Sequence, residues 1–329
     1  TMGKGTVSER HPLSVGIVGY YMGFNGRTHH LRDLVTEADV VLLVGNRTNQ
    51  NGTDSWKLYP KDARYIQIDI DGEEIGRNYE ALRLAGDARL ALAALSDELK
   101  KRDLARRQAG RKALEDKIAD GHAKFLAGSE ALRTSSRAPI RPERLMEELA
   151  PRLRADDIVV ADASYSSNWI SNYLVAEEAG QRFLTPRGLA GLGWGLPMAM
   201  GAKVGNPDKR IICLAGDGGF AHCWVELETA RRMGLAVTLM VLNNQILGYP
   251  KHAESLRFGM HTDAVHFEPV DHAAIARACG LPGIRVERAD EIGPALDEAL
   301  ANQSQTTLID VMTDPDAHPP ITLFEDLQN

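Results

Sequence analysis

The 329-residue sequence has few cysteines, no long apolar run and no excess of positive charge. Its three cysteines, Cys213, Cys223 and Cys279, are too few and too scattered for a disulfide framework or a cysteine-rich zinc site. No stretch approaches 18 uninterrupted apolar residues and no cationic-then-apolar segment opens the chain, which predicts neither a transmembrane helix nor a signal peptide. Lysine and arginine number 38 against 45 aspartate and glutamate, and this net charge of −7 excludes a generally basic nucleic-acid binder. We therefore expect a reduced, cytoplasmic protein without nucleic-acid or membrane partners.

The composition is that of a folded protein with a substantial core. Hydrophobic residues make up 43% and charged residues 25%, and the length suggests two domains. The stretch from Lys100 to about Arg137 is dense in charge and sparse in apolar positions. This is typical of a solvated helix, or pair of helices, between domains. Pro139 and Pro142 interrupt it, and Pro142 opens a new helix. The predicted parts are a first region over residues 1–100, a helical charged connector over 101–138 and a second region over 139–329.

The first region alternates between strands and helices. An uninterrupted apolar run at residues 40–45 indicates a strand buried on both faces, as in a parallel sheet. A second strand is predicted over residues 65–71, and helices are predicted over 32–38 and 88–100. This alternation is typical of a doubly wound α/β domain.

The second region repeats the same pattern. Strands are predicted over residues 157–162, 211–215, 237–242 and 307–311. Helices are predicted over 197–204, 222–233, 271–279 and 289–302. We therefore predict an α/β fold with two doubly wound parallel-sheet domains.

Polar residues follow two consecutive strands of the second region. A Gly-Asp-Gly-Gly sequence occupies positions 216–219, and the next strand ends in two asparagines at 243–244. Glycines let the backbone approach a phosphate, although a plain tight turn is the alternative explanation. Because parallel neighbours end at the same sheet edge, Asp217 and Asn244 are expected to lie together there. One carboxylate and one amide oxygen suit Mg²⁺, which completes its octahedron with water and phosphate.

These motifs resemble the diphosphate and Mg²⁺ motif of thiamine-diphosphate (ThDP) enzymes. The match includes the spacer of 24 residues from Gly219 to Leu242. Residues 188–202 resemble the segment that grips the aminopyrimidine in acetolactate synthases and their relatives, and residues 243–249 also resemble that family. Residues 68–87 look like its central domain. The resemblance covers nearly the whole chain and implies a partial, nucleotide-binding-type central domain, N-terminally incomplete, followed by a ThDP diphosphate-binding domain.

The resemblance also implies roles for individual residues. Asp217 and Asn244 would bind Mg²⁺ through their side chains, and Ile246 would bind it through its backbone carbonyl. Leu192 would force the cofactor into a V that brings its 4′-imino nitrogen beside thiazolium C2, although plain core packing is the alternative. The Ala190 carbonyl and the Leu192 N–H would hold the pyrimidine edge. The remaining cofactor contacts would be Ser164, Tyr165, Ser166, Gly216, Gly218 and Gly219.

Residues of the first region have two alternative interpretations each. Arg47 lies where the family contacts FAD or ADP, but the following residues depart from the acetolactate synthase FAD signature, so both nucleotides stay open. Asp69 and Asp87 could reach a ribose or adenine, or they could cap turns.

Three histidines follow the asparagine pair. His252, His261 and His266 could line the substrate pocket and transfer protons, or they could be surface and packing histidines. Their spacings of nine and five are not those of a zinc site.

The family normally activates its cofactor with a glutamate from a pyrimidine-binding domain, and this sequence has no match to that domain. We therefore expect the glutamate to come from a second polypeptide or from a removed upstream segment. The resemblance also implies a homo- or hetero-oligomer, a dimer or tetramer of active units, with the cofactor at an interface.

The leading hypothesis is a ThDP- and Mg²⁺-dependent C–C bond lyase, carboligase or decarboxylase that acts on a 2-oxo acid and is acetolactate-synthase-like. One alternative is an ADP-binding enzyme like 2-hydroxyacyl-CoA lyase or oxalyl-CoA decarboxylase. A second alternative is a non-catalytic regulatory subunit, which is disfavoured because Asp217, Asn244 and Leu192 are all present.

Overall fold

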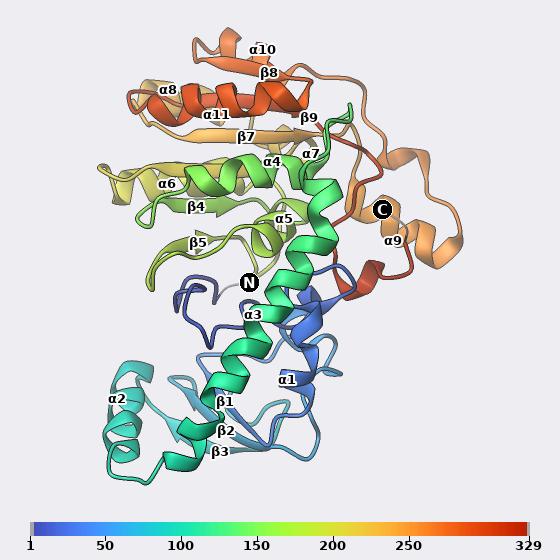
Figure 1. The fold of residues 1–329 in the computed structure, drawn as a ribbon. Coiled ribbons are helices and arrows are strands. Elements are labelled where there is room, and N and C mark those ends of the chain that lie inside the picture. The colour runs from blue at the N-terminus through green and yellow to red at the C-terminus, as the bar shows by residue number, and fades with distance from the viewer. Residues whose placement is uncertain (1–2, 328–329) are drawn as a thin grey trace.

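Two parallel β-sheets organise residues 3–327, the part of the chain that the computed structural model describes. One sheet has three strands and the other has six, and every strand pair in both is parallel. Figure 1 shows the sheets at opposite ends of the molecule, with the long helix α3 (Ala105–Arg133) running between them. The predicted α/β class with two doubly wound parallel sheets is confirmed.

The small sheet has the strand order β1-β2-β3 and is built from the first region of the chain. Its strands are β1 (Val40–Val44), β2 (Arg64–Asp69) and β3 (Ala81–Ala85), and the helices of this region are α1 (Arg32–Thr36) and α2 (Ala88–Leu99). One face packs into a core in which Leu43 and Tyr65 meet Leu31 and Ile118. The predicted strands and helices of this region therefore exist, and β3 is an additional strand that its charged Arg83 concealed.

The other face of the small sheet is open, so the prediction that residues 40–45 are buried on both faces is wrong. Val40 and Leu42 are 45% and 40% exposed, and Leu82 on β3 is also exposed. Successive side chains on a strand point to opposite faces, and only the face that carries Leu43 is packed. Helix α2 contributes no buried residue within the described chain, so it covers little of this apolar surface.

The large sheet has the strand order β5-β4-β6-β7-β9-β8. Its strands are β4 (Ile158–Ala161), β5 (Arg182–Leu184), β6 (Ile211–Gly216), β7 (Thr238–Asn243), β8 (Gly283–Val286) and β9 (Thr307–Met312). Its helices are α4 (Pro142–Leu149), α5 (Tyr165–Tyr173), α6 (Gly195–Gly205), α7 (Asp217–Ala221), α8 (Glu226–Arg232), α9 (Gly248–Phe258), α10 (His272–Ala278) and α11 (Ile292–Ala301).

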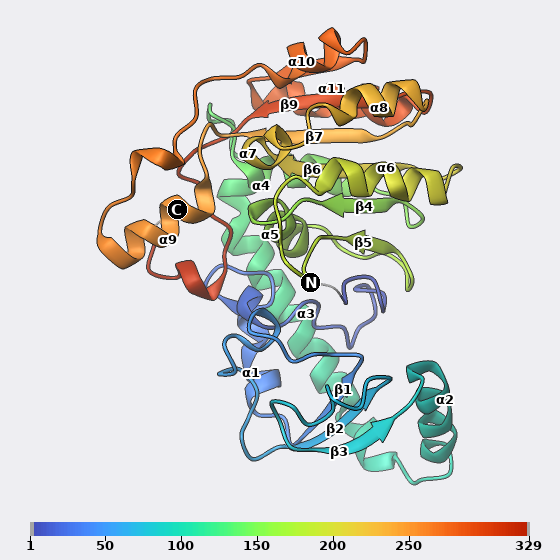
Figure 2. The same ribbon diagram turned by 180° about the vertical axis from the view of Figure 1, so that it is seen from behind.

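Helices cover both faces of this large sheet. Helices α4, α5 and α11 lie on the side facing the viewer in Figure 1, and α6, α8 and α10 lie on the side facing the viewer in Figure 2. Strand β6 shows the consequence, because Ile212 and Leu214 enter one core while Ile211 and Cys213 enter the other. The helix predicted over residues 222–233 is wrong in extent, since α7 begins earlier, at Asp217, and a turn separates it from α8.

The connector is one helix rather than two, and it is not fully solvated. Ile118 on α3 packs into the core of the small sheet, whereas Phe125 packs into the core of the large sheet. The first residues of the chain also reach across, because Lys4 Nζ donates to the Leu174 carbonyl at 2.7 Å. Near the other end of the chain, Thr322 Oγ1 donates to Asp54 Oδ1 at 2.6 Å. These contacts tie the two sheets together.

No helix within residues 3–327 combines the length and the apolar character needed to cross a membrane.

Candidate active site

The candidate site lies at the point where the large sheet reverses its winding direction. From β4 the chain continues to the edge strand β5, and from β6 it continues in the opposite direction to β7. Ligands bind in such crevices, outside the carboxyl ends of the strands. A cavity of about 130 Å³ occupies this crevice. The predicted site residues that line it are Ser164, Tyr165, Ser166, Leu192, Gly216, Asp217, Gly218, Gly219, Asn244 and Ile246.

Asp217 is a buried acid of this cavity. Its Oδ1 accepts a hydrogen bond from the Gly218 N–H at 2.8 Å, and its Oδ2 accepts one from the Gln245 N–H at 2.7 Å. Within the described residues it has no cationic partner. Burial raises the pKa of Asp217 to about 6, although these backbone donors lower it. The carboxylate therefore sits in a place where a bound cation would stabilise its charge.

Asn244 follows the neighbouring strand, as the parallel arrangement of β6 and β7 requires. Its Oδ1 accepts a hydrogen bond from the Ile246 N–H at 3.3 Å. Gln245, between them, has a φ of 59°, in the left-handed region that few residues other than glycine adopt. This turn directs the Gln245 N–H back to Asp217. It also brings the three predicted metal ligands, Asp217, Asn244 and Ile246, to one sheet edge.

These oxygens fit a hard cation. Asp217, Asn244 and the Ile246 carbonyl offer one carboxylate, one amide and one peptide oxygen, a set suited to Mg²⁺ with the remaining positions left for phosphate and water. Within residues 3–327 no cluster of three or more histidine, cysteine, aspartate or glutamate residues could hold a metal. The candidate site offers a single carboxylate together with an amide and a peptide oxygen, so it is not a cluster of that kind.

Asp162, which follows β4, is a structural acid of the site that the sequence analysis missed. Its Oδ2 accepts a hydrogen bond from the Gly193 N–H at 3.0 Å, and its Oδ1 accepts one from the Trp194 N–H at 3.2 Å. A Cβ at Gly219 would lie 2.3 Å from Asp162 Oδ2, so glycine is required there. Asp162 therefore contacts both the Gly218–Gly219 turn and the loop between β5 and α6, residues 185–194, which we call the Leu192 loop. Its position directly after an apolar strand, as for Asp217, was the available signal.

The Leu192 loop forms the exposed rim of the cavity. Leu192 is 37% exposed and lines the cavity, while Leu189 and Trp194 are more exposed. Ala190 has a φ of 54° and Ser164, on the opposite side of the crevice, has a φ of 67°. Such strained positions persist where the surrounding structure holds them, and they are frequent at functional sites. Ala190 lines the larger cavity that adjoins this one.

The three histidines separate into two groups. His252 is buried outside the cavity, and its Nδ1 lies 2.6 Å from the hydroxyl of Tyr165, which lines the cavity. Burial lowers the pKa of His252 to about 4, so its imidazole is neutral at pH 7. His261 and His266 lie nearer the surface, with their Nε2 atoms 3.2 Å apart. Neither of these two lines the cavity, and their role in proton transfer stays a prediction.

Arg47, Asp69 and Asp87 lie in the other domain, at the carboxyl edge of the small sheet. Arg47 follows β1 and its Nε lies 3.7 Å from Glu74 Oε1. Asp69, at the end of β2, accepts a hydrogen bond from the Asp71 N–H at 3.0 Å. Asp87 caps α2 by accepting from the Leu90 N–H. Both aspartates thus serve local turns, and a nucleotide-binding role for the three residues stays a prediction.

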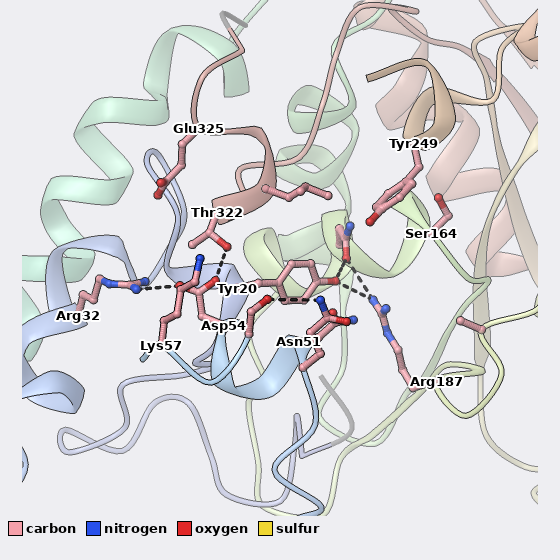
Figure 3. Close-up of a pocket in the computed structure, with 15 residues that line it drawn as sticks. Tyr20, Arg32, Asn51, Asp54, Lys57, Ser164, Arg187, Tyr249, Thr322 and Glu325 are labelled. Atoms are coloured by element: carbon pink, nitrogen blue, oxygen red, sulfur yellow. Dashed lines mark hydrogen bonds and ion pairs between the residues drawn. The ribbon is translucent and has the colours of Figure 1, made fainter. Parts of the chain in front are cut away.

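A larger cavity of about 700 Å³ lies between the two sheets and adjoins the first. Ser164 and Tyr249 line both cavities. Figure 3 shows Ser164, Tyr249 and Arg187 on one side of it and Arg32, Lys57 and Glu325 on the other. The sequence analysis missed its cationic lining residues because they are far apart in the chain.

Two family descriptions match the chain. "Thiamine pyrophosphate enzyme, central domain" matches residues 1–95, and "Thiamine pyrophosphate enzyme, C-terminal TPP binding domain" matches residues 162–311. The second match includes the part of the smaller cavity's lining that runs from Asp162 to Pro250.

Individual relatives match over nearly the full chain. It is 30% identical over 328 residues to a "probable acetolactate synthase large subunit" of Methanococcus aeolicus, covering 95% of this chain and 53% of the relative. It is 32% identical over 337 residues to a "sulfoacetaldehyde acetyltransferase" of Roseovarius nubinhibens, covering 94% and 54%. It is 28% identical over 301 residues to the "acetolactate synthase isozyme 2 large subunit" of Escherichia coli, covering 91% and 51%. The chain therefore spans about half the length of these relatives.

Proposed function

Because this chain belongs to the thiamine-diphosphate-dependent enzyme superfamily, we propose that it forms part of a ThDP- and Mg²⁺-dependent lyase, carboligase or decarboxylase acting on a 2-oxo acid. The observation that carries the proposal is the buried Asp217 carboxylate, which lies without a cationic partner at the switch point, beside Asn244 and two glycines. A carboxylate in that position is suited to hold a metal that carries a diphosphate.

The metal and diphosphate would occupy the smaller cavity. Asp217, Asn244 and the Ile246 carbonyl would ligate Mg²⁺. Gly218 and Gly219 keep side-chain atoms away from the diphosphate, and a Cβ at Gly218 would come within 2.9 Å of Leu247 and Phe267. The backbone at these positions is therefore as close to the cavity as the packing permits.

When bound, ThDP supplies the electron sink that lets a bond next to a carbonyl carbon be broken or formed. The chain itself would contribute orientation. Leu192 and Ala190 would support the ring portion of the cofactor from the exposed loop, and Asp162 holds that loop through two backbone hydrogen bonds. Tyr165 would present its hydroxyl at the cavity wall, where it is hydrogen-bonded to the neutral His252.

The acetolactate-synthase-like reaction is the version we favour, because the relatives named above carry the names acetolactate synthase and sulfoacetaldehyde acetyltransferase. As a second part of the proposal, Arg47, Asp69 and Asp87 would bind a nucleotide, FAD or ADP, in the central domain. We also keep the cytoplasm as the expected compartment, because all three cysteines are free.

We propose further that a pyrimidine-binding domain, from another segment or another chain, completes the site. No glutamate lines the smaller cavity among the described residues, and the exposed apolar residues Leu189 and Trp194 are close in the chain to Leu192, which lines it. The open apolar face of the small sheet, with Val40 and Leu42, offers a second surface for such a partner.

Calorimetric titration of ThDP into the purified protein, together with any co-purifying chain, tests this function. We expect binding that requires Mg²⁺ and is lost with EDTA. An absence of ThDP binding at saturating Mg²⁺ would refute the proposal.

A further inference from the structure

The cavity between the two sheets contains an arginine whose charge is not neutralised. Arg187 lines this 700 Å³ cavity, and within the described residues no carboxylate lies within ion-pairing distance of it. Arg32, across the cavity, has such a partner in Asp54 at 2.7 Å. Lys57 also has none, but its side chain is exposed. Arg187 is therefore the half-buried cation of this cavity that still needs an anion.

Arg187 is also held in one position. Its Nη2 lies 2.5 Å from Ser167 Oγ and 3.1 Å from each of Tyr20 Oη, Tyr21 Oη and Asn168 Oδ1. Tyr20 and Asn168 line the cavity with it, and Figure 3 shows the contact between Arg187 and Tyr20. Such anchoring removes the rotamer entropy that a free arginine would lose on binding.

None of these partners cancels the charge. Burial and the neighbouring Tyr21 raise the pKa of Tyr20 well above 10, so its hydroxyl is neutral. Asn168 is neutral as well. The Nε of Arg187 is buried and has no hydrogen-bond partner. A half-buried guanidinium whose charge has no partner is stabilised when an anion binds beside it.

We propose that Arg187 anchors the acidic group of the substrate, a carboxylate or sulfonate, in the cavity between the sheets. This inference rests on the proposed function, because Ser164 and Tyr249 connect the cavity to the candidate cofactor site. A charge-assisted hydrogen bond from a guanidinium to an anionic group is stronger than a hydrogen bond between neutral groups. The volume of about 700 Å³ lies within the range of small-molecule sites. The substrate class is a small acid, and Asn51 is a further polar group that lines the same cavity.

The test is direct binding without ThDP, so that no turnover interferes. Pyruvate, ethanesulfonate and the neutral methyl pyruvate are titrated into the protein and into its Arg187→Met and Arg187→Lys variants. Arg187→Met is expected to weaken binding of the acid about 10- to 100-fold and to leave methyl pyruvate unchanged. Arg187→Lys, which keeps the charge but not the fork, should lie between them. The preferred acid, pyruvate or ethanesulfonate, identifies the group. Arg182→Met, at an exposed position on β5, is the matched control.

A second measurement needs no variant. Phenylglyoxal modifies accessible arginines, and the acid is expected to protect Arg187 but not Arg182 in peptide mass spectra. Unchanged affinity in Arg187→Met, or protection by ADP and not by the acids, would overturn the proposal, the latter assigning the cavity to a nucleotide phosphate. ThDP binding is measured separately on each variant. Loss of acid binding with ThDP binding intact therefore concerns Arg187 alone, while an absence of ThDP binding in the parent protein concerns the proposed function.

Discussion

The carboxylate of Asp217 accepts a hydrogen bond from the backbone N–H of Gln245 at 2.7 Å. This bond joins the turn after β6 to the turn after β7, which are 28 residues apart in the chain. It forms because the two strands are parallel neighbours, with Gly216 opposite Leu242 in the register. The left-handed backbone of Gln245 directs its N–H toward the acid. The two motif halves thus become one oxygen-lined site before any metal is bound.

Replacing Asp217 by alanine should abolish Mg²⁺-dependent ThDP binding. The carboxylate is the charged ligand of the proposed metal, so we expect the affinity to fall by at least about 100-fold. Stability should change little, because the loss of two backbone hydrogen bonds is offset by removing an acid whose charged form is disfavoured by burial. Calorimetric titration measures the affinity and urea unfolding measures the stability. Asp208→Ala, at an exposed acid between α6 and β6, is the control and should bind normally. Retention of micromolar ThDP binding by Asp217→Ala would remove Asp217 from the metal site.

Leu192→Ala should keep the cofactor and lose rate. The side chain lies at the cavity wall and away from the diphosphate anchor, so truncation would relax the bent cofactor without releasing it. A misplaced reacting group costs on the order of 10²-fold in rate. Because Leu192 is 37% exposed, the unfolding free energy should fall by only about 1 kcal/mol. ThDP-dependent consumption of a 2-oxo acid, at saturating cofactor and with any partner present, measures the effect. Full activity would leave Leu192 a packing residue.

Asp162→Asn should loosen the Leu192 loop. An amide group would present a donor where the carboxylate accepts hydrogen bonds from Gly193 and Trp194, so one buried bond is replaced by a clash. We expect a loss of about 2 kcal/mol in unfolding free energy and weaker ThDP binding. Thermal unfolding and titration measure the two effects, and Asp156→Asn at an exposed position is the control. Equal loss of stability in the control would show that the loop contacts are not the cause.

His252 predicts how stability depends on pH. Burial lowers its pKa from the ordinary 6.5 to about 4 in the folded protein. Between these values the unfolded chain binds a proton that the folded chain does not, so stability falls as the pH falls from about 6.5 to about 4. The loss attributable to His252 is at most about 3 kcal/mol.

His252→Gln should flatten this part of the profile, since glutamine does not titrate and can still bond to Tyr165. Urea unfolding at pH 7 and pH 4.5 measures the difference between the variant and the parent. His11→Gln, at an exposed position, should leave the profile unchanged. A parent and variant that lose stability equally would contradict the burial of a neutral imidazole at this position.

Local sequence was sufficient for the long buried strands of the large sheet and for its polar edge. The apolar runs that became β4, β6, β7 and β9 are buried on both faces, so their hydrophobicity could be recognised without knowing their neighbours. Asp217 and Asn244 each follow such a run, and parallel pairing then places them at one edge. The short strands β5 and β8 and the interrupted start of α8 carry weaker patterns and were not predicted.

Long-range packing decided the rest. Whether residues 40–45 are covered on one face or two depends on helices that the run itself does not specify. Arg187 and Tyr20 are 167 residues apart, and Asp162 and Gly193 are 31 apart. The first contact arises because α3, with Ile118 and Phe125 in separate cores, holds the small sheet against the large one. The second arises because the loop between β5 and α6 folds back over the end of β4. Burial and hydrogen-bond geometry are properties of that assembled interior, so the second cavity and the hydrogen bonds of Asp162 to the Leu192 loop became visible only in three dimensions.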